Sequence, residues 1–474
     1  MATECTRESF AFHALGRRDV VARFDGGRIT SDAGGLLLRE VERATGIIRQ
    51  FAGCFRDYRN PDLIEHTVEE LVAQRVYGLA LGYEDLNDHD DLRHDPLLAV
   101  LAGKEDPLGN NRHRKRDRGK ALAGKSTLNR LELTPAGATP ASRYKKIKVD
   151  RLAVQALFTE VFLQAHDQPP ERIVLDLDAT DDPLHGHQLG RFFHGYYGHY
   201  CYLPLYIFCG EHLLCARLRP SDIDASAGAV KELARIVLAI REQWPAVQIM
   251  VRGDSGFCRE EIMSWCEEHG VGYVLGCAKN ERLIQEIVRE LQGAKRLFEA
   301  TGRPARVFKD FQYQTRRSWT RARRVVAKAE HLAKGPNPRF VVTSLSAAEL
   351  DAQTVYEDEY CARGDMENRI KEQQLYLFAD RTSAATMRAN ELRLWFSSVA
   401  YLLLAALRRL GLQGTELAKA QCDTIRVKLL KIGAQIRVTV RKVWLSLAES
   451  CPYQHVFRQA YYHLRRLCSV PLRC

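Results

Sequence analysis

The spacing of apolar residues divides the chain into regions of different character. Within residues 1–165, apolar positions recur every three or four residues over Leu36–Ile48 and Leu63–Leu81. This period indicates amphipathic helices. No strand-like alternation of comparable length is evident in this region. We therefore predict a mainly helical N-terminal region that ends near residue 165.

The pattern changes near Glu171, where short apolar segments begin to alternate with helical ones. Their order is strand, strand, strand, helix, strand, helix, strand, which predicts an α/β fold with a mixed sheet flanked by helices. The predicted strands are Ile173–Ala179, Tyr202–Cys209, Leu213–Leu218, Gln248–Arg252 and Gly272–Cys277, and the predicted helices are Ala225–Gln243 and Arg259–His269.

Beyond residue 280 this alternation stops. One helix is followed by strand candidates at Ala305–Thr315, Arg323–Lys328 and Arg339–Leu345, which predict an inserted β subdomain. From Asp365 a long helical pattern runs to about Leu410. The predicted regions are 1–165, mainly helical; 166–280, first part of the sheet; 281–350, inserted β subdomain; 351–415, second part of the core with the long helix; and 416–474, a basic C-terminal region with alternation at Ile436–Val443.

Charge and composition narrow the classes of partner. The chain has 70 Lys and Arg against 59 Asp and Glu, a net charge of +11, which favours a polyanion such as a nucleic acid. Its 13 cysteines are scattered without a CxxC pair, which argues against a disulfide framework or zinc ribbon. The longest apolar stretch, Leu394–Leu407, has 14 residues, and a membrane span needs roughly 20. Met1–Arg18 has no apolar signal core, so we expect a cytoplasmic protein.

Three carboxylates fall where a sheet of this kind places its chemistry. Asp178 ends the first core strand, Asp254 follows the fourth, and Glu367 lies in the first turns of the long helix. Sites in such sheets form at the carboxyl ends of strands, and clustered acids need a counter-cation. Oxygen ligands suit Mg²⁺ or Mn²⁺, and two such ions can promote phosphoryl transfer. A lone Asp after a strand is more often a turn former, but the three together favour a site.

Residues 171–410 resemble the DDE transposases of bacterial insertion sequences, in the subgroup with an all-β insertion before the catalytic Glu. The marker of that subgroup is Tyr, two residues, Arg, three residues, Glu, six residues, Lys. Tyr360, Arg363 and Glu367 match it, whereas Gln374 stands at the Lys position. Lys371 lies one helical turn after Glu367.

The resemblance implies an RNase H-like fold, two Mg²⁺ (or Mn²⁺) ions held by Asp178, Asp254 and Glu367, and a DNA end lined by Tyr360, Arg363 and Lys371. It also implies double-stranded DNA as partner, both transposon ends and target, and a homodimer or higher oligomer on that DNA at the bacterial nucleoid. From the residues alone, Arg363 has two possible roles: a bidentate grip on a phosphate, or a salt bridge to Glu367 or a neighbouring acid.

Two further signals concern DNA. Between Arg112 and Lys125, seven Lys and Arg stand against Asp117 alone, a density that favours phosphate contact over a merely solvated face. Trp319 lies among arginines in the predicted insertion, where it either stacks on a flipped base or belongs to the core of the subdomain. The residues of the basic run to which we assign DNA contact are Arg114, Lys115, Arg116 and Arg118.

Two other patterns are set aside. Gly119–Ser126 matches the P-loop pattern, but a P-loop follows a hydrophobic strand, and here a run of charges precedes it. The histidines between residues 185 and 199 show no recognised metal spacing and indicate a polar loop near the DNA.

The sequence therefore predicts a transposase that binds terminal inverted repeats and catalyses DNA cleavage and strand transfer. One alternative is a transposase-derived DNA-binding protein that no longer cuts, which the presence of all three acids disfavours. Another is a nuclease without strand transfer, which needs neither the N-terminal region nor the insertion.

Overall fold

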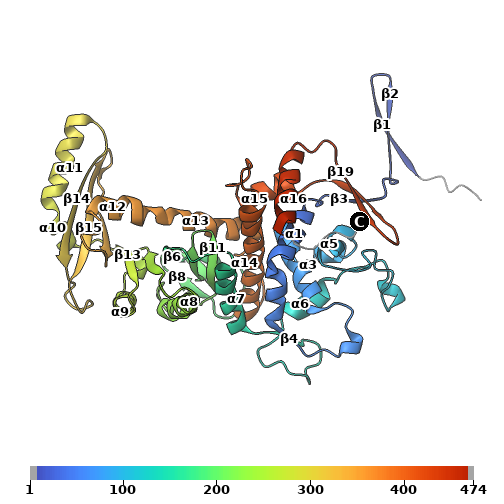
Figure 1. Cartoon of the computed structure of the whole chain (residues 1–474), viewed down its shortest axis with the longest axis horizontal. Coiled ribbons are helices and arrows are strands. Elements are labelled where there is room, and N and C mark those ends of the chain that lie inside the picture. The colour runs from blue at the N-terminus through green and yellow to red at the C-terminus, as the bar shows by residue number, and fades with distance from the viewer. Residues whose placement is uncertain (1–7, 468–474) are drawn as a thin grey trace, which may run out of the picture. The chain divides into compact units, whose positions relative to one another are not determined.

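The computed structural model describes residues 8–467, which fold as two compact units (Figure 1). The sheet unit comprises Asp150–Ser398, and the terminal unit combines the chain up to Val149 with the chain from Val399 onwards. The unit boundaries thus lie before those predicted at residues 165 and 415. Helix α7 (Arg151–Gln164) belongs to the sheet unit, and α14 (Met387–Leu410) runs from one unit into the other.

A nine-stranded mixed sheet organises the sheet unit. Its order is β11-β10-β6-β12-β13-β17-β15-β14, with β16 paired to β15. The first strand along the chain, β6, pairs antiparallel with β10 and parallel with β12, and β13 is parallel to β12. The strands are β6 (Arg172–Ala179), β10 (Leu205–Cys209), β11 (His212–Arg217), β12 (Gln248–Gly253), β13 (Gly272–Cys277), β14 (Ala305–Tyr313), β15 (Arg323–Leu332), β16 (Gly335–Pro336) and β17 (Arg339–Thr343). The predicted mixed sheet is therefore confirmed.

The strands predicted for the inserted subdomain are present, but they continue this sheet. β17 pairs antiparallel with β13, with Cys277 opposite Phe340, and β15 and β14 follow outward. An edge strand has unpaired N–H and C=O groups that another strand can satisfy, and the apolar residues of β17 are buried against β13. These strands therefore do not form a separate β subdomain.

The alternation along β6 separates two faces. Ile173, Leu175 and Leu177 pack into the core that contains α8 and α9, whereas Val174 packs with Val355 on the opposite face. Asp176 and Asp178 follow Val174 at intervals of two, so they share its face. The helices are α8 (Ala229–Gln243), α9 (Glu260–Glu268), α10 (Glu281–Glu286) and α11 (Val288–Thr301), and the last packs on β14 and β15.

The long helix predicted from Asp365 to about Leu410 is observed as two separate helical segments. The helical segment 352–376 comprises α12 (Ala352–Thr354), a π-helical stretch (Val355–Tyr360), a 3₁₀ stretch (Cys361–Arg363), α13 (Gly364–Lys371) and a second π-helical stretch (Glu372–Tyr376). It begins early because the Asp351 side chain caps it by accepting from the backbone N–H of Gln353 and Thr354. It stops because Phe378 has a φ of 61°, which no right-handed helix can contain. Glu367 therefore lies well inside a helical segment, and α14 is a separate helix.

The terminal unit contains both helices and strands. Gly46 (φ 65°) breaks the first predicted helix into two, and a capping box between Thr67 and Glu70 begins α3. The helices are α1 (Gly35–Thr45), α2 (Ile47–Gly53), α3 (Val68–Leu81), α4 (His89–Leu92), α5 (Pro96–Leu101), α6 (Lys125–Glu132), α15 (Cys422–Ile425) and α16 (Gln454–Leu467), and β4 (Phe55–Asp57) pairs with β5 (Ile147–Val149).

A hairpin of β1 (Ser9–Leu15) and β2 (Arg18–Arg23) precedes the first helix and projects from the rest of its unit (Figure 1). Every residue of both strands is exposed. No strand was predicted here, because the alternation spans only a few residues and these residues are not buried.

The two ends of the chain complete one another within the terminal unit. β3 (Arg28–Thr30) pairs with β18 (Ala434–Val438), which pairs with β19 (Val443–Leu447). The backbone N–H of Gly34 donates to the Leu430 carbonyl at 3.1 Å. A Cβ atom on Gly34 would lie 1.9 Å from the Leu429 carbonyl oxygen, so this close approach requires glycine.

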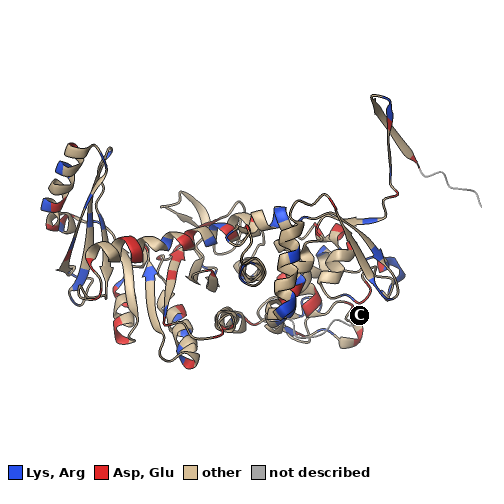
Figure 2. Cartoon of the chain, turned by 45° about the horizontal axis from the view of Figure 1, so that its top comes forward, with Lys and Arg blue, Asp and Glu red and all other residues tan. Residues whose placement is uncertain are grey.

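Lys and Arg residues occur throughout both units (Figure 2). Between residues 8 and 467, no helix is both long and apolar enough to span a membrane. The cysteines of this described part, from Cys54 to Cys451, are free thiols.

Candidate active site

Asp178 lies at the carboxyl end of β6, on the face that the helical segment 352–376 covers. Its side chain is 17% exposed, and its Oδ1 accepts a hydrogen bond from the backbone N–H of Ala179 at 2.8 Å. Its neighbour on this face, Asp176, is fully engaged elsewhere. The Arg252 guanidinium donates to both Asp176 oxygens, at 2.5 and 2.8 Å.

Arg252 also fixes the helical segment to the sheet. Its Nη1 donates to the Glu359 carbonyl at 2.5 Å, and Arg172 forms an ion pair with the Glu359 carboxylate at 2.7 Å. Asp176 is therefore a buried structural partner of Arg252, and Asp178 is the carboxylate left at the edge of the sheet.

Asp254 lies beside Asp178 because of the strand register. Leu177 of β6 is opposite Gly253 of β12 in a parallel pair, so the next residue of each strand is an aspartate. Neighbouring strands are about 4.8 Å apart. Asp254 Oδ1 accepts from the backbone N–H of Gly256 at 2.9 Å, which caps the short helix that follows.

Arg363 links the first acid to the third. Its Nη2 donates to Glu367 Oε1 at 2.5 Å, and its Nη1 lies 3.5 Å from Asp178 Oδ2. In this structure Arg363 therefore forms ion pairs with both acids, which is one of the two roles predicted for it. The Glu367 side chain is 42% exposed, so this carboxylate faces solvent on one side.

The pKa of the Asp178 carboxyl is raised to about 7. Burial is the main cause; Arg363 opposes the shift, and the charges of Asp254 and Glu367 add to it. The three acids therefore affect one another electrostatically, and one guanidinium does not fully compensate them.

The chemistry of the donor set fits a hard divalent cation, because all three side chains offer carboxylate oxygens. Their present arrangement is not yet a coordination shell. Among the residues that the structure describes, no three of His, Cys, Asp or Glu come close enough together to hold a metal ion. Arg363 occupies the position between Asp178 and Glu367 and supplies the positive charge there.

The sequence profile described as "Transposase DDE domain group 1" matches residues 12–469, which is nearly the whole chain. The chain belongs to this DDE transposase family. No match to a curated protein was found.

Tyr360 of the transposase lies against the end of β13. A Cβ atom on Gly276 would be 2.5 Å from the Tyr360 hydroxyl and 3.2 Å from the carbonyl carbon of Asp254. This tyrosine, three residues before Arg363, therefore lies close to the second acid. The sequence around Gly276 does not indicate this close approach.

Gln374 stands at the position where the resemblance implies a lysine, and its side chain forms hydrogen bonds within the transposase. Gln374 Nε2 donates to Asp182 Oδ1 at 3.0 Å and to the Asp181 carbonyl at 3.1 Å. Burial raises the pKa of the Asp182 carboxyl well above its usual value, and the hydrogen bond from Gln374 opposes this shift. Lys371 is exposed on α13, one turn beyond Glu367, and stays a candidate for DNA contact.

Trp319 is buried, with 7% of its surface exposed. Its ring packs edge-on against Tyr313 at 5.7 Å, and the Arg323 guanidinium lies 5.7 Å from its centre. Of the two roles predicted for Trp319, stacking on a flipped base and core packing, the structure supports core packing, because a ring enclosed by the core offers no face to a base.

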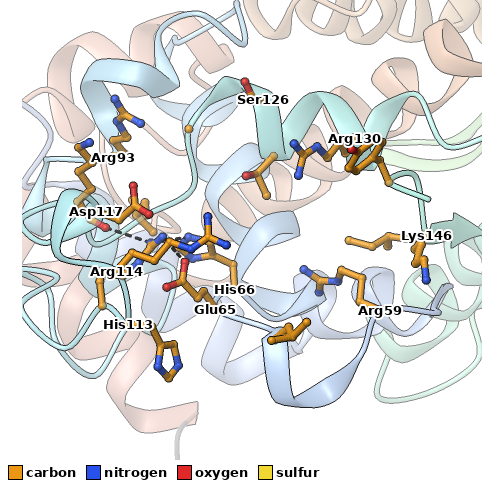
Figure 3. A pocket seen from close by; sticks show the side chains of 18 of the residues that line it. Arg59, Glu65, His66, Arg93, His113, Arg114, Asp117, Ser126, Arg130 and Lys146 are labelled. Atoms are coloured by element: carbon orange, nitrogen blue, oxygen red, sulfur yellow. Dashed lines mark hydrogen bonds and ion pairs between the residues drawn. The ribbon is translucent and has the colours of Figure 1, made fainter. Parts of the chain in front are cut away.

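The basic run lies in the terminal unit, beside a cavity of 590 Å³. Arg114 lines this cavity together with Arg130 and Lys146, which come from its other side (Figure 3). Arg112 is bound to Glu65 at 2.6 Å, and so it is already paired. The remaining assigned residues, Lys115, Arg116 and Arg118, are exposed.

The P-loop pattern has no P-loop structure. Residues 121–123 are buried but form no strand, and α6 begins after them. Lys125 Nζ lies 3.5 Å from Asp90 and 3.2 Å from the Asn87 side chain, so the lysine of the pattern is paired within the unit. The histidine loop forms a small sheet of β7 (Asp182–Pro183), β8 (Phe192–His194) and β9 (His199–Tyr202), in which His199 pairs with Asp181 at 2.7 Å.

Proposed function

We propose that this DDE transposase binds the terminal inverted repeats of an insertion sequence and catalyses metal-dependent DNA cleavage and strand transfer. The observation that carries the proposal is the meeting of Asp178 and Asp254 at adjacent strand ends, with Arg363 joining Asp178 to Glu367. A site of this kind on an α/β sheet suits phosphoryl transfer, in which catalysis consists of positioning and charge stabilisation.

We further propose that the core is RNase H-like. Three antiparallel strands, β6, β10 and β11, precede two parallel ones that alternate with helices, and β6 lies at the centre. The insertion lies between β13 and the helical segment that carries Glu367, which is the place the resemblance implies.

Asp178, Asp254 and Glu367 would hold two Mg²⁺ or Mn²⁺ ions, which would polarise the phosphate and activate the attacking oxygen. Arg363 is suited to exchange its two carboxylate partners for a phosphate, since a guanidinium binds both groups in the same forked geometry. Tyr360 and Lys371 lie along the same helical segment and would line the DNA end.

The terminal unit would bind duplex DNA through its basic run. Arg114, Lys115, Arg116 and Arg118 are exposed, and such cations gain affinity from DNA by releasing counterions. The partners proposed are the two element ends and the target, and the active form proposed is a homodimer or higher oligomer assembled on them.

The test uses a plasmid that carries both ends of the element. Purified Asp178→Ala, Asp254→Ala and Glu367→Ala proteins should each lose cleavage by at least about 100-fold, because three acids that share metal ions act as a unit. Binding of the ends, measured without divalent ions, should persist. Asp358→Ala is the matched control, because Asp358 is an exposed acid on the same helical segment.

Cleavage by any of the three variants at the level of the control would remove that acid from the site. Should the wild-type protein bind the ends but cut nothing in Mg²⁺ or Mn²⁺, the alternative of an inactive, transposase-derived DNA-binding protein would take its place.

A further inference from the structure

A second cavity, of 360 Å³, adjoins the active site within the sheet unit. Ser255, the residue after Asp254, forms part of its wall. The residues that matter for its chemistry are Ser255, Gly276, Lys279, Asn337, Arg339 and Tyr360. No Asp or Glu of the described chain lines it, in contrast to the cavity of the terminal unit.

The sheet register brings its two cations to the edge where Asp254 lies. β13 ends at Cys277, which is opposite Phe340 of the antiparallel β17. Lys279 therefore lies just beyond the end of β13, at the same edge of the sheet where Arg339 begins β17. Because β12 ends at this same edge, both cations lie near the second catalytic acid.

The polar groups of this cavity are mostly unused hydrogen-bond donors. Within residues 8–467 no hydrogen bond or ion pair is formed by the side chains of Lys279, Arg339 or Ser255, nor by the Tyr360 hydroxyl. Asn337 is engaged, since its amide donates to Glu330 at 2.7 Å. Two cations and two hydroxyls without a carboxylate suit an anion with several acceptor oxygens.

Gly276 keeps the inner end of the cavity open. A Cβ atom at this position would lie 2.5 Å from the Tyr360 hydroxyl and 3.0 Å from the backbone nitrogen of Ser255. A side chain here would displace the hydroxyl that faces the cavity.

The cavity lacks a place for a base. Phe340 is buried, and the Tyr360 ring packs on Tyr356 at 5.7 Å, which leaves its hydroxyl as the polar group available to the cavity. Binding of a nucleobase generally uses a free aromatic face. The site therefore suits a sugar–phosphate backbone better than a free nucleotide.

We propose that this cavity binds a phosphodiester of the DNA backbone that lies next to the phosphodiester that is cut. Lys279 and Arg339 are the substrate-binding residues. Tyr360 and Ser255 donate their hydroxyl hydrogens to the same group. This inference rests on the proposed function and adds to it the place where the neighbouring backbone is held.

The experiment compares Lys279→Gln/Arg339→Gln with Arg289→Gln/Arg296→Gln, which removes the same charge from exposed positions on α11. Binding of the element end is measured by fluorescence anisotropy over a salt series without divalent ions, and phosphate contacts are mapped by ethylation interference. The cavity variant should lower the log–log salt slope by about one to two units. It should also lose interference at phosphates next to the cleavage point, whereas the α11 variant keeps both. Lys279→Arg/Arg339→Lys should restore them.

A cavity variant with an unchanged thermal midpoint and the salt slope and interference pattern of the wild type would overturn this inference while leaving the proposed function intact. If the wild-type protein itself bound no element end, the proposed function and the inference would fall together.

Discussion

At the scale of single residues, the candidate site is a problem of charge balance. Asp178 and Glu367 share the guanidinium of Arg363. Burial is the main cause that raises the pKa of Asp178 to about 7; Arg363 opposes this shift, and the charges of Asp254 and Glu367 add to it. Asp176 lies two residues earlier on the same face, yet it has a complete partner in Arg252. Two aspartates of one strand thus have opposite roles, one structural and one available for chemistry.

This difference predicts opposite phenotypes. Asp176→Asn should destabilise the protein by about 3–5 kcal/mol, because it leaves buried Arg252 without its counter-charge. Asp178→Asn should fold normally and abolish cleavage. Urea denaturation and end-cleavage assays on both proteins check this. A well-folded but inactive Asp176→Asn together with an active Asp178→Asn would move the assignment back by two residues.

Site residues differ in how far their sequence reveals them. The positions of Asp178 and Asp254 could be predicted because each lies at the end of a recognisable strand, and strand ends are where such sheets place their chemistry. The environment of Trp319 could not, since its burial depends on Tyr313 and on packing that no local pattern encodes. Lys279 has a usable signal, because it lies two residues after the end of the core strand β13.

At the scale of elements, the strands were predicted better than the helical segment. Period-two and buried apolar runs located β6, β10 to β13 and the insertion, but not the pairing of β17 with β13, which joins distant segments. Residues 355–360 are π-helical, and their i to i+5 hydrogen bonds shift side chains away from the 3.6-residue period. The helical pattern therefore becomes evident only after Gly364.

The loop that contains the basic run gives a prediction at this scale. Replacing Arg114, Lys115, Arg116 and Arg118 with Gln should weaken DNA binding and reduce its salt dependence by about one log–log unit per lost phosphate contact. These side chains are exposed, so folding should not change. Fluorescence anisotropy at several salt concentrations measures the slope of the salt dependence. An unchanged slope would show that the basic run is ordinary solvated surface.

At the scale of the whole molecule, the chain builds one unit from its middle and another from its two ends. The expected C-terminal region is not independent: β18 pairs with β3, and the backbone at Leu429 and Leu430 lies against Gly34. Sequence patterns locate such segments but not their association, because the contacts join residues about 400 positions apart.

This association predicts an asymmetry between two glycines. Gly34→Ala should lower the free energy of unfolding by about 1–3 kcal/mol, because its methyl group would collide with a backbone carbonyl that cannot turn aside. Gly53→Ala is the control: no atom lies within 4 Å of its added Cβ, and the change should be neutral or slightly stabilising. Chemical denaturation of both variants measures the difference, and equal midpoints would show that the contact at Gly34 is dispensable.

The divided terminal unit also has a consequence in time. During synthesis its first part leaves the ribosome before the 249 residues of Asp150–Ser398 and must wait for the chain from Val399 to follow. At about 5–20 residues per second this delay is roughly 12–50 s. The backbone at Gly34, which contacts Leu429 and Leu430, lacks these partners for at least that interval, whereas the sheet unit can fold as soon as it has emerged. A newly made chain therefore completes its middle unit before the unit that combines its first part with the chain from Val399 onwards.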